Sequence, residues 1–257
     1  MKRIAAFIYG IVCYALFFVS LLYAIGFLGN FVVPKSIDSG PEGSAFTALL
    51  IDAALLALFA LQHSIMARPW FKQVWTSIVP QPVERSTYVL FSSLALLLIF
   101  WQWQPIGVVI WNLDGGIAET IVLGLYATGL LVVLLSTFLI NHFDLFGMRQ
   151  VYLYLVGRPY THLEFRTPFF YRHVRHPLYF GWLLTFWAAP VMTVAHLFFA
   201  VMTTAYILVA IRFEEADLIH AHGDKYRRYR KQVPMIVPAL SVHAIKETHE
   251  TSGNTAA

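Results

Sequence analysis

Long runs without a charged residue most constrain how this chain can fold. Four runs, interrupted only by Asp52, lie at 4–30, 44–66, 87–103 and 120–140, and a fifth covers 178–211. A helix of roughly 20 apolar residues crosses the ~30 Å hydrocarbon layer of a bilayer. Of all residues, 58% are hydrophobic and only 12% are charged. The core of one soluble domain cannot bury so large a share of apolar side chains. The sequence therefore predicts an all-α fold, a polytopic integral membrane helical bundle.

The fifth run is too long for a single crossing, because one continuous helix over it would measure about 51 Å. Pro190 lies inside this run, and proline interrupts a helix interior. We therefore expect a hairpin of two short helices at 178–189 and 194–213. The bundle would then have about six spans, with the last two forming the hairpin.

We expect a single transmembrane domain at 1–240. It would include a cytoplasmic segment at 141–177, which is too long to remain a structureless loop, and an amphipathic C-terminal helix at 214–232. The polar tail at 241–257 contains no aromatic residue, a composition typical of disorder.

The basic residues indicate the orientation. In the six-span topology every Lys and Arg except Lys35 lies on one side of the membrane. Cytoplasmic loops carry such an excess, so both termini are expected in the cytoplasm. The formal net charge of +4 is then mostly juxtamembrane, where it favours contact with anionic membrane lipids rather than with nucleic acid.

The stretch RHVRHPLYFG, at 172–181, begins the predicted hairpin. Pro177 suits the first position of a helix and biases His176 out of the helical region. The free backbone N–H groups at this helix start lie beside Arg172, Arg175 and His176, which together form a potential site for a carboxylate or phosphate. Gly181 would allow a ligand or a second helix to approach closely.

A second charged cluster lies where the hairpin returns to the same membrane face. It contains Arg212, Glu214 and Glu215, which the hairpin geometry brings to the depth of His176. Charges at the end of a span, opposite another charged cluster, indicate a functional site. Tyr226 and Tyr229 follow on the amphipathic helix and would add aromatic groups. Alternatively, Arg212 and Glu215 form only a local ion pair, and the tyrosines only hold their helix on the membrane.

These motifs resemble membrane-embedded methyltransferases. The superfamily, which includes isoprenylcysteine carboxyl methyltransferase and phospholipid methyltransferases, is matched by RHVRHPLYFG, RFEE at 212–215, and the spaced tyrosines and Val-Pro that follow. Three further stretches resemble a narrower bacterial branch, the methanethiol S-methyltransferases and their relatives associated with denitrification: LQHSIMARP at 61–69, ERSTYVL at 84–90 and NHFDLFGMRQVY at 141–152.

The resemblance implies S-adenosyl-L-methionine as the cofactor, bound at the cytoplasmic face of a bacterial inner membrane. By analogy, His176, Tyr179 and Gly181 would line the cofactor pocket. The carboxylate of the cofactor would contact Arg212. The amino or ribose groups of the cofactor would contact Glu214 or Glu215. The remaining candidate cofactor-binding residues are Arg175, Tyr226 and Tyr229. The phospholipid branch carries an additional G-x-G cofactor motif that this sequence lacks. We expect Glu215→Ala to abolish cofactor binding and leave folding intact.

The resemblance to the narrower branch implies a small volatile thiol as the acceptor, with methanethiol converted to dimethyl sulfide. The nucleophile in such a transfer is a thiolate, so a base or a positive field should assist removal of the thiol proton. His63, His142 and Asp144 stand near the cytoplasmic ends of their spans. With Arg212, these three residues are the catalytic candidates.

Other functions fit parts of the sequence. The acceptor could be another thiol, an isoprenylcysteine or a lipid. A membrane transporter could use the buried acid Asp52, and the 10 histidines suggest a haem protein, although no histidine pair is placed deep within the spans. We expect no metal site, and the lone Cys13 excludes a thiolate metal cluster. Only the methyltransferase explains both charged clusters.

Overall fold

The computed structural model describes residues 1–113 and 115–238, and it is almost entirely helical. Within these ranges, five helices are long and apolar enough to span a membrane. They are α1 (Lys2–Gly29), α2 (Ala45–Ala67), α4 (Gln81–Gln102), α5 (Ile117–Ile140) and α9 (Val194–His222). The protein is therefore a polytopic helical membrane protein, as predicted.

Shorter elements connect the long helices. They are α3 (Pro69–Trp75), β1 (Val109–Asn112), α6 (His142–Leu145), α7 (Met148–Leu155), the 3-10 helix η1 (Phe169–Arg172), α8 (Pro177–Trp187), β2 (Val191–Thr193) and α10 (Asp224–Gln232). The tail expected to be disordered, at 241–257, lies outside the described residues.

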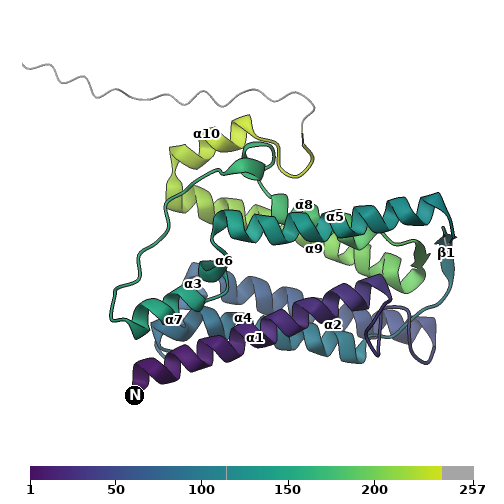
Figure 1. Cartoon of the computed structure of the whole chain (residues 1–257), viewed down its shortest axis with the longest axis horizontal. Coiled ribbons are helices and arrows are strands. Elements are labelled where there is room, and N and C mark those ends of the chain that lie inside the picture. Colours follow the sequence, from purple (N-terminus) through teal and green to yellow (C-terminus); the bar gives the residue numbers. More distant parts are fainter. Residues whose placement is uncertain (114, 239–257) are drawn as a thin grey trace, which may run out of the picture.

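The long helices form two layers that run along the same axis (Figure 1). One layer contains α1, α2 and α4, and the other contains α5, α8 and α9. At one end of the molecule, α10 lies beside the beginning of α8, and α3 and α7 lie at the end of the first layer. This end carries the basic residues, so it corresponds to the predicted cytoplasmic face.

A short antiparallel ribbon closes the opposite end. Its strands are β1 and β2, paired with Val109 opposite Thr193 and Asn112 opposite Val191. Strand β1 precedes α5 and β2 precedes α9, so the ribbon links the N-terminal ends of two helices of the second layer.

The hairpin is present: its first helix, α8, agrees with the expected 178–189 to within two residues, and its second helix is longer than expected. Helix α8 has 11 residues, or about 16 Å, and is too short to cross the hydrocarbon layer as a helix. The chain still reaches the opposite end, because β2 pairs there with β1. Among the described residues the chain thus passes six times between the two ends of the bundle, five times as a long helix and once as α8 with the chain that follows it. The second hairpin helix does not end at 213 but continues to His222, and Gly223, with φ 55°, divides the expected helix at 214–232.

Two glycines set the packing of α8 on α5. A Cβ atom at Gly181 would lie 2.7 Å from the carbonyl oxygen of Gly129 and 2.9 Å from the backbone nitrogen of Val133. The two backbones approach too closely for any larger side chain. Gly181, expected to line the cofactor site, thus has its Cβ position filled by a neighbouring helix.

Large aromatic side chains fill the main hydrophobic core of the bundle. Phe27 and Trp103 are fully buried, and Phe199 packs against Trp103 with ring centroids 5.6 Å apart. Many leucines, isoleucines and valines of the long helices are instead exposed on the outer faces, as expected for residues that contact lipid.

Asp52 is buried near the non-basic end of the bundle. Its Oδ1 accepts a hydrogen bond of 2.9 Å from the backbone nitrogen of Gln104, just beyond the end of α4. This contact gives Asp52 a role in joining α2 to α4, so a transport path is not needed to explain a buried acid.

Candidate active site

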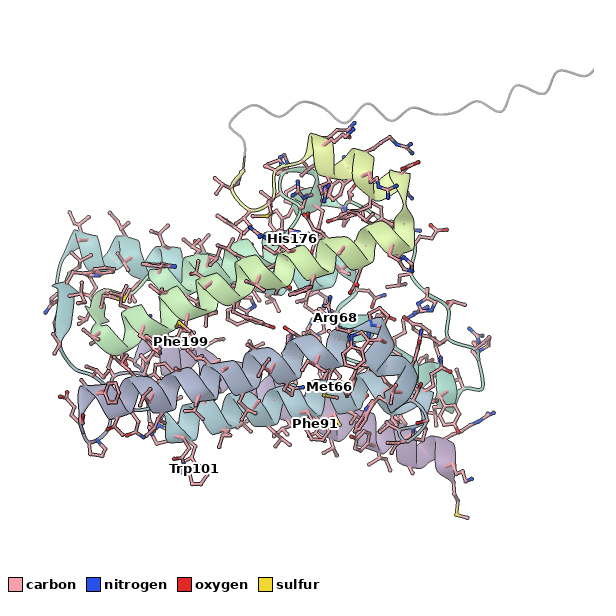
Figure 2. The ribbon with its side chains drawn as sticks, turned by 180° about the vertical axis from the view of Figure 1, so that it is seen from behind. Met66, Arg68, Phe91, Trp101, His176 and Phe199 are labelled. Atoms are coloured by element: carbon pink, nitrogen blue, oxygen red, sulfur yellow. The ribbon has the colours of Figure 1, made fainter. Side chains whose placement is uncertain are left out.

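Glu215 joins the two charged clusters that the sequence singled out. Its Oε1 accepts a hydrogen bond from Arg175 Nε at 2.7 Å and lies 3.2 Å from His176 Nε2. The residue is only 7% exposed. Figure 2 shows His176 in the layer of α8 and α9, and Arg68 across from it in the other layer, at the same end of the molecule. Arg175, His176, Tyr179, Glu214 and Glu215 are called the His176 cluster below.

The local backbone explains why the chain carries Val-Pro after α10. The backbone nitrogens of Arg175 and His176 donate to the carbonyls of Pro234 and Met235, at 2.9 and 3.1 Å. Arg175 Nη1 also donates to the carbonyl of Val233 at 2.6 Å. Arg175 therefore holds the C-terminal segment in place and compensates the buried charge of Glu215, which leaves it few donors for a ligand.

Glu214 has a different environment from its neighbour. Its Oε2 accepts a 2.9 Å hydrogen bond from the hydroxyl of Tyr179 and lies 3.8 Å from His176 Nδ1. Its side chain is 42% exposed, and its other oxygen has no hydrogen bond to a described residue. Glu214 is therefore the carboxylate of the cluster that remains available to a ligand.

Tyrosines surround these carboxylates. Tyr226 is 1% exposed, and Tyr229 donates to the carbonyl of Tyr171 at 2.6 Å. The hydroxyls of Tyr171 and Tyr226 are buried and have no partner among the described residues. Burial raises the pKa of Tyr171 and of Tyr226, and nearby carboxylates, including that of Glu214, raise both further. These hydroxyls remain protonated and are free to donate to a ligand.

The end of α2 lies against the turn of α9 that carries Glu214. Arg68 Nη1 donates to Asp217 Oδ2 at 2.8 Å, and the hydroxyls of Ser64 and Tyr206 are 3.1 Å apart. Both contacts join the two layers. They place residues of LQHSIMARP, from early in the chain, beside the His176 cluster.

His63 lies one residue before Ser64, within a polar group. Its Nε2 is 2.8 Å from the hydroxyl of Tyr88, its Nδ1 is 3.0 Å from the hydroxyl of Ser92, and its ring stacks on Phe59. Glu214 interacts electrostatically with Tyr88. Among the candidate bases, His63 is thus the one that the structure brings next to the cluster.

His142 is placed elsewhere, on the side of α1. Its two ring nitrogens are 2.7 Å from the hydroxyl of Tyr14 and 2.9 Å from the hydroxyl of Thr137, and its ring stacks on Phe138. Burial lowers the pKa of His142, so the ring stays neutral. Both ring nitrogens are engaged and an aromatic shell surrounds the ring, and these contacts hold His142 against α1 rather than beside the His176 cluster.

Asp144 is likewise engaged. It forms a 2.8 Å ion pair with Arg149 and accepts a hydrogen bond from Tyr160. Within residues 1–113 and 115–238, no hydrogen bond, ion pair or ring contact links Asp144 or His142 to the His176 cluster. The structure therefore does not bring His142 and Asp144 together with His63, because α6 turns toward α1 and α7.

Arg212 also lies apart from the cluster. It is on the exposed face of α9, together with Leu208, Val209 and Ala216, and it forms no ion pair with a described residue. Successive residues are about 100° apart around a helix. Glu214 therefore lies on the face of α9 opposite to Arg212, and Glu215 lies on an adjoining face. The structure therefore does not place Arg212 where it would meet a cofactor held by Glu214.

Sequence reasoning missed three site residues. Tyr206 stands inside an apolar run, where its hydroxyl gave no visible signal. Tyr88 belonged to the noted ERSTYVL stretch, but nothing in the sequence indicated which of its residues faces inward. Tyr171 precedes the RHVRHP motif by one residue and is recognisable only from its unpartnered buried hydroxyl.

The arrangement as a whole can bind a positively charged or hydroxyl-bearing ligand. One accessible carboxylate, Glu214, is surrounded by protonated phenols, and the His63–Tyr88 pair lies on the facing layer. Carboxylates and aromatic faces both attract cations in a site with little water.

The chain is similar to several known proteins over most of its length. The chain is 59% identical to "Methanethiol S-methyltransferase" of Crocosphaera subtropica over 93% of this chain and 94% of that protein. It is 49% identical to the protein of the same name from Mycobacterium tuberculosis, over 93% and 98%. It is also 31% identical to "Nurim" of Xenopus laevis, over 70% and 65%. No family model and no solved structure matches the chain.

Proposed function

This chain belongs to the methanethiol S-methyltransferase family, and from that premise we propose that it transfers a methyl group from S-adenosyl-L-methionine to methanethiol, forming dimethyl sulfide. It is a methyltransferase and a multi-pass integral membrane protein. The observation that supports the location of its site is the meeting of Glu214, Tyr179 and His176 at the cytoplasmic ends of α8 and α9.

The donor set of this site fits the proposed cofactor. S-adenosyl-L-methionine has an ammonium group and ribose hydroxyls, which suit the free carboxylate oxygen of Glu214, and a carboxylate, which suits a hydroxyl donor. Tyr171 and Tyr226 are buried donors without an acceptor, a costly condition that a bound ligand would relieve. We therefore assign Glu214, Tyr171 and Tyr226 to the cofactor, with Tyr179 and His176 orienting Glu214.

When bound, the sulfonium supplies an activated methyl group. The residues of this chain have to hold the thiol in line with that group, exclude water and receive the thiol proton. The reaction forms one S–C bond, breaks another, and releases one proton for each dimethyl sulfide.

We assign receipt of that proton to the imidazole of His63, with the Tyr88 hydroxyl passing its own proton to the ring as it takes up the thiol proton. A simple thiol is largely protonated near neutral pH, so a nearby acceptor raises the thiolate fraction. His63 bonds to Tyr88 at 2.8 Å and lies on the layer facing Glu214, whereas His142 lies on the side of α1, against Tyr14. A methyl acceptor arriving from the bilayer would reach this position between the layers.

We further propose that the protein is in a bacterial inner membrane, with both termini and the site on the cytoplasmic side. The uneven distribution of Lys and Arg supports this orientation.

Headspace gas chromatography tests the proposed activity. Purified protein receives S-adenosyl-L-methionine with methanethiol, and parallel samples receive a prenylated cysteine or a phospholipid with methyl-labelled cofactor. We expect dimethyl sulfide in the first sample and no label transfer in the others. Label transfer to the prenylated cysteine or lipid, with no dimethyl sulfide, would contradict the proposed acceptor.

A further inference from the structure

A cavity of about 650 Å³ lies at the basic end of the molecule, away from the His176 cluster. It is enclosed by α3, the beginning of α4, α6 and the chain that follows α7. Three cationic side chains line it, those of Lys72, Arg85 and Arg158. The proposed reaction uses none of these residues.

These three cations form no ion pair with a described residue. Two acids also line the cavity, but Asp144 is already paired with Arg149, and the single charge of Glu84 balances at most one cation. Burial lowers the pKa of Lys72, and the charge of Arg85 lowers it further. The cavity therefore holds uncompensated positive charge that an anion would stabilise.

A second, mostly apolar cavity of about 490 Å³ adjoins the first. The two share the lining residues Pro82 and Tyr154, so they lie side by side. The second lies between the beginnings of α1 and α4; Ala5, Ala6 and Val83 line it, and Lys2 is its one charged lining residue. A basic cavity beside an apolar groove matches a molecule with an anionic head and a hydrocarbon chain.

The neighbouring helix α3 indicates the depth of the site in the membrane. Trp70 and Val74 of α3, and Ile78 in the turn just after it, are 59%, 66% and 73% exposed, and they follow one another at spacings of four residues. An exposed apolar stripe beside a basic surface is typical of a helix lying at the bilayer interface. Lys72, on the same helix, is then at the level of the lipid headgroups.

We propose that these adjoining cavities bind an anionic glycerophospholipid, with its phosphate between Lys72, Arg85 and Arg158 and one acyl chain in the groove beside Ala6. Gln150 Oε1, which is buried without a donor, would accept a hydrogen bond from a hydroxyl group of a glycerol headgroup. The lipid would fasten α3 and the residues after α7 to the ends of α1 and α4.

Native mass spectrometry of the detergent-purified full chain tests this site. The probes are phosphatidylglycerol and phosphatidylcholine of equal chain length. We expect phosphatidylglycerol to bind at least about ten-fold more tightly to the parent protein. Equal binding of the two lipids would overturn the proposal, because the charge of the headgroup would then be irrelevant.

A charge-matched pair of variants locates the binding. Lys72→Gln with Arg158→Gln should weaken phosphatidylglycerol binding about ten-fold, because two of the three cations that attract the lipid phosphate are then neutral. Arg228→Gln with Lys231→Gln, which removes two exposed charges from α10, should leave binding within about two-fold. Equal weakening in both pairs would overturn the site.

A third variant tests the groove without changing any charge. Ala6→Trp should fill the groove and weaken phosphatidylglycerol binding, while binding of inorganic phosphate should be undetectable in both parent and variant. Unchanged lipid binding in Ala6→Trp, or competition by inorganic phosphate at equal concentration, would show a site for a free anion and would contradict a lipid site. This variant also serves if the double variant fails to fold.

Discussion

The hydroxyl of Tyr179 donates a 2.9 Å hydrogen bond to Oε2 of Glu214, across 35 positions of sequence. Tyr179 lies in the first turn of α8, and Glu214 lies in the last third of α9. The bond holds Oε2 of Glu214 against α8 and leaves the other carboxylate oxygen without a hydrogen bond to a described residue. This pair distinguishes Glu214, which is available to a ligand, from its buried neighbour Glu215.

Replacing Tyr179 by Phe should therefore weaken binding of S-adenosyl-L-methionine. A hydrogen bond to a charged group contributes about 1.5–3 kcal/mol, which corresponds to roughly a 10- to 100-fold rise in Kd. Isothermal titration calorimetry measures this change. An unchanged Kd would mean that the orientation of Glu214 does not depend on Tyr179.

Glu215→Ala should destabilise the protein, contrary to the expectation from sequence that folding stays intact. The substitution leaves the Arg175 guanidinium buried without its carboxylate, a change that costs about 3–5 kcal/mol. Asp224→Asn, which breaks the exposed pair with Arg227, is the control and should cost less than about 1 kcal/mol. Thermal unfolding in detergent compares the two; equal melting temperatures would contradict the assigned structural role of Glu215.

Gly181→Ala should loosen the packing of α8 on α5. Its new methyl group would meet the Gly129 carbonyl, and overpacking of this kind costs about 1–3 kcal/mol. Gly124→Ala, where nothing lies within 4 Å of the added atom, should be neutral or slightly stabilising. The Kd for cofactor of folded Gly181→Ala should stay near that of the parent. A large rise in Kd with no loss of stability would instead place Gly181 in the cofactor site.

His142 should make stability depend on pH. Burial lowers its folded-state pKa below the ordinary value of 6.5, so the unfolded chain binds the proton more readily. The stability contributed by the neutral ring is present above pH 6.5 and falls as the pH drops below it, by at most about 1.4 kcal/mol per pH unit. His142→Gln should have a flatter melting profile than the parent between about pH 7.5 and about pH 5, on either side of the ordinary histidine pKa. Identical profiles would contradict the burial of a neutral ring.

The sequence predicted the parts of the fold that depend on hydropathy and charge. Long uncharged runs located the spans, and the return of the hairpin correctly brought Glu214 and Glu215 to His176. Pro190 also predicted the short first hairpin helix, expected at 178–189 and observed at Pro177–Trp187. The strand that follows it was not predictable in this way. The pairing of β2 with β1 depends on a contact between loops that are far apart in sequence.

Side-chain direction explains the differences at the site. Arg212 and Glu214 are two positions apart, yet they face different sides of α9, and only the packing of α2 against α9 determines which side is internal. In the same way, NHFDLFGMRQVY was recognised as a motif, but its His142 contacts Tyr14 of α1, which no spacing within the motif indicated. Positions were thus inferred from sequence more reliably than orientations.

The most direct test of the central claim compares Glu214→Gln with Arg212→Gln, two neutral substitutions on one helix. Dimethyl sulfide formation and the Kd for S-adenosyl-L-methionine are measured for both, alongside the parent. A site between the layers predicts that Glu214→Gln loses at least about ten-fold in cofactor affinity, as expected for a hydrogen bond to a charged group, and most of its activity, while Arg212→Gln keeps both. Full activity in Glu214→Gln together with loss in Arg212→Gln would place the site on the outer face of α9 and contradict the account.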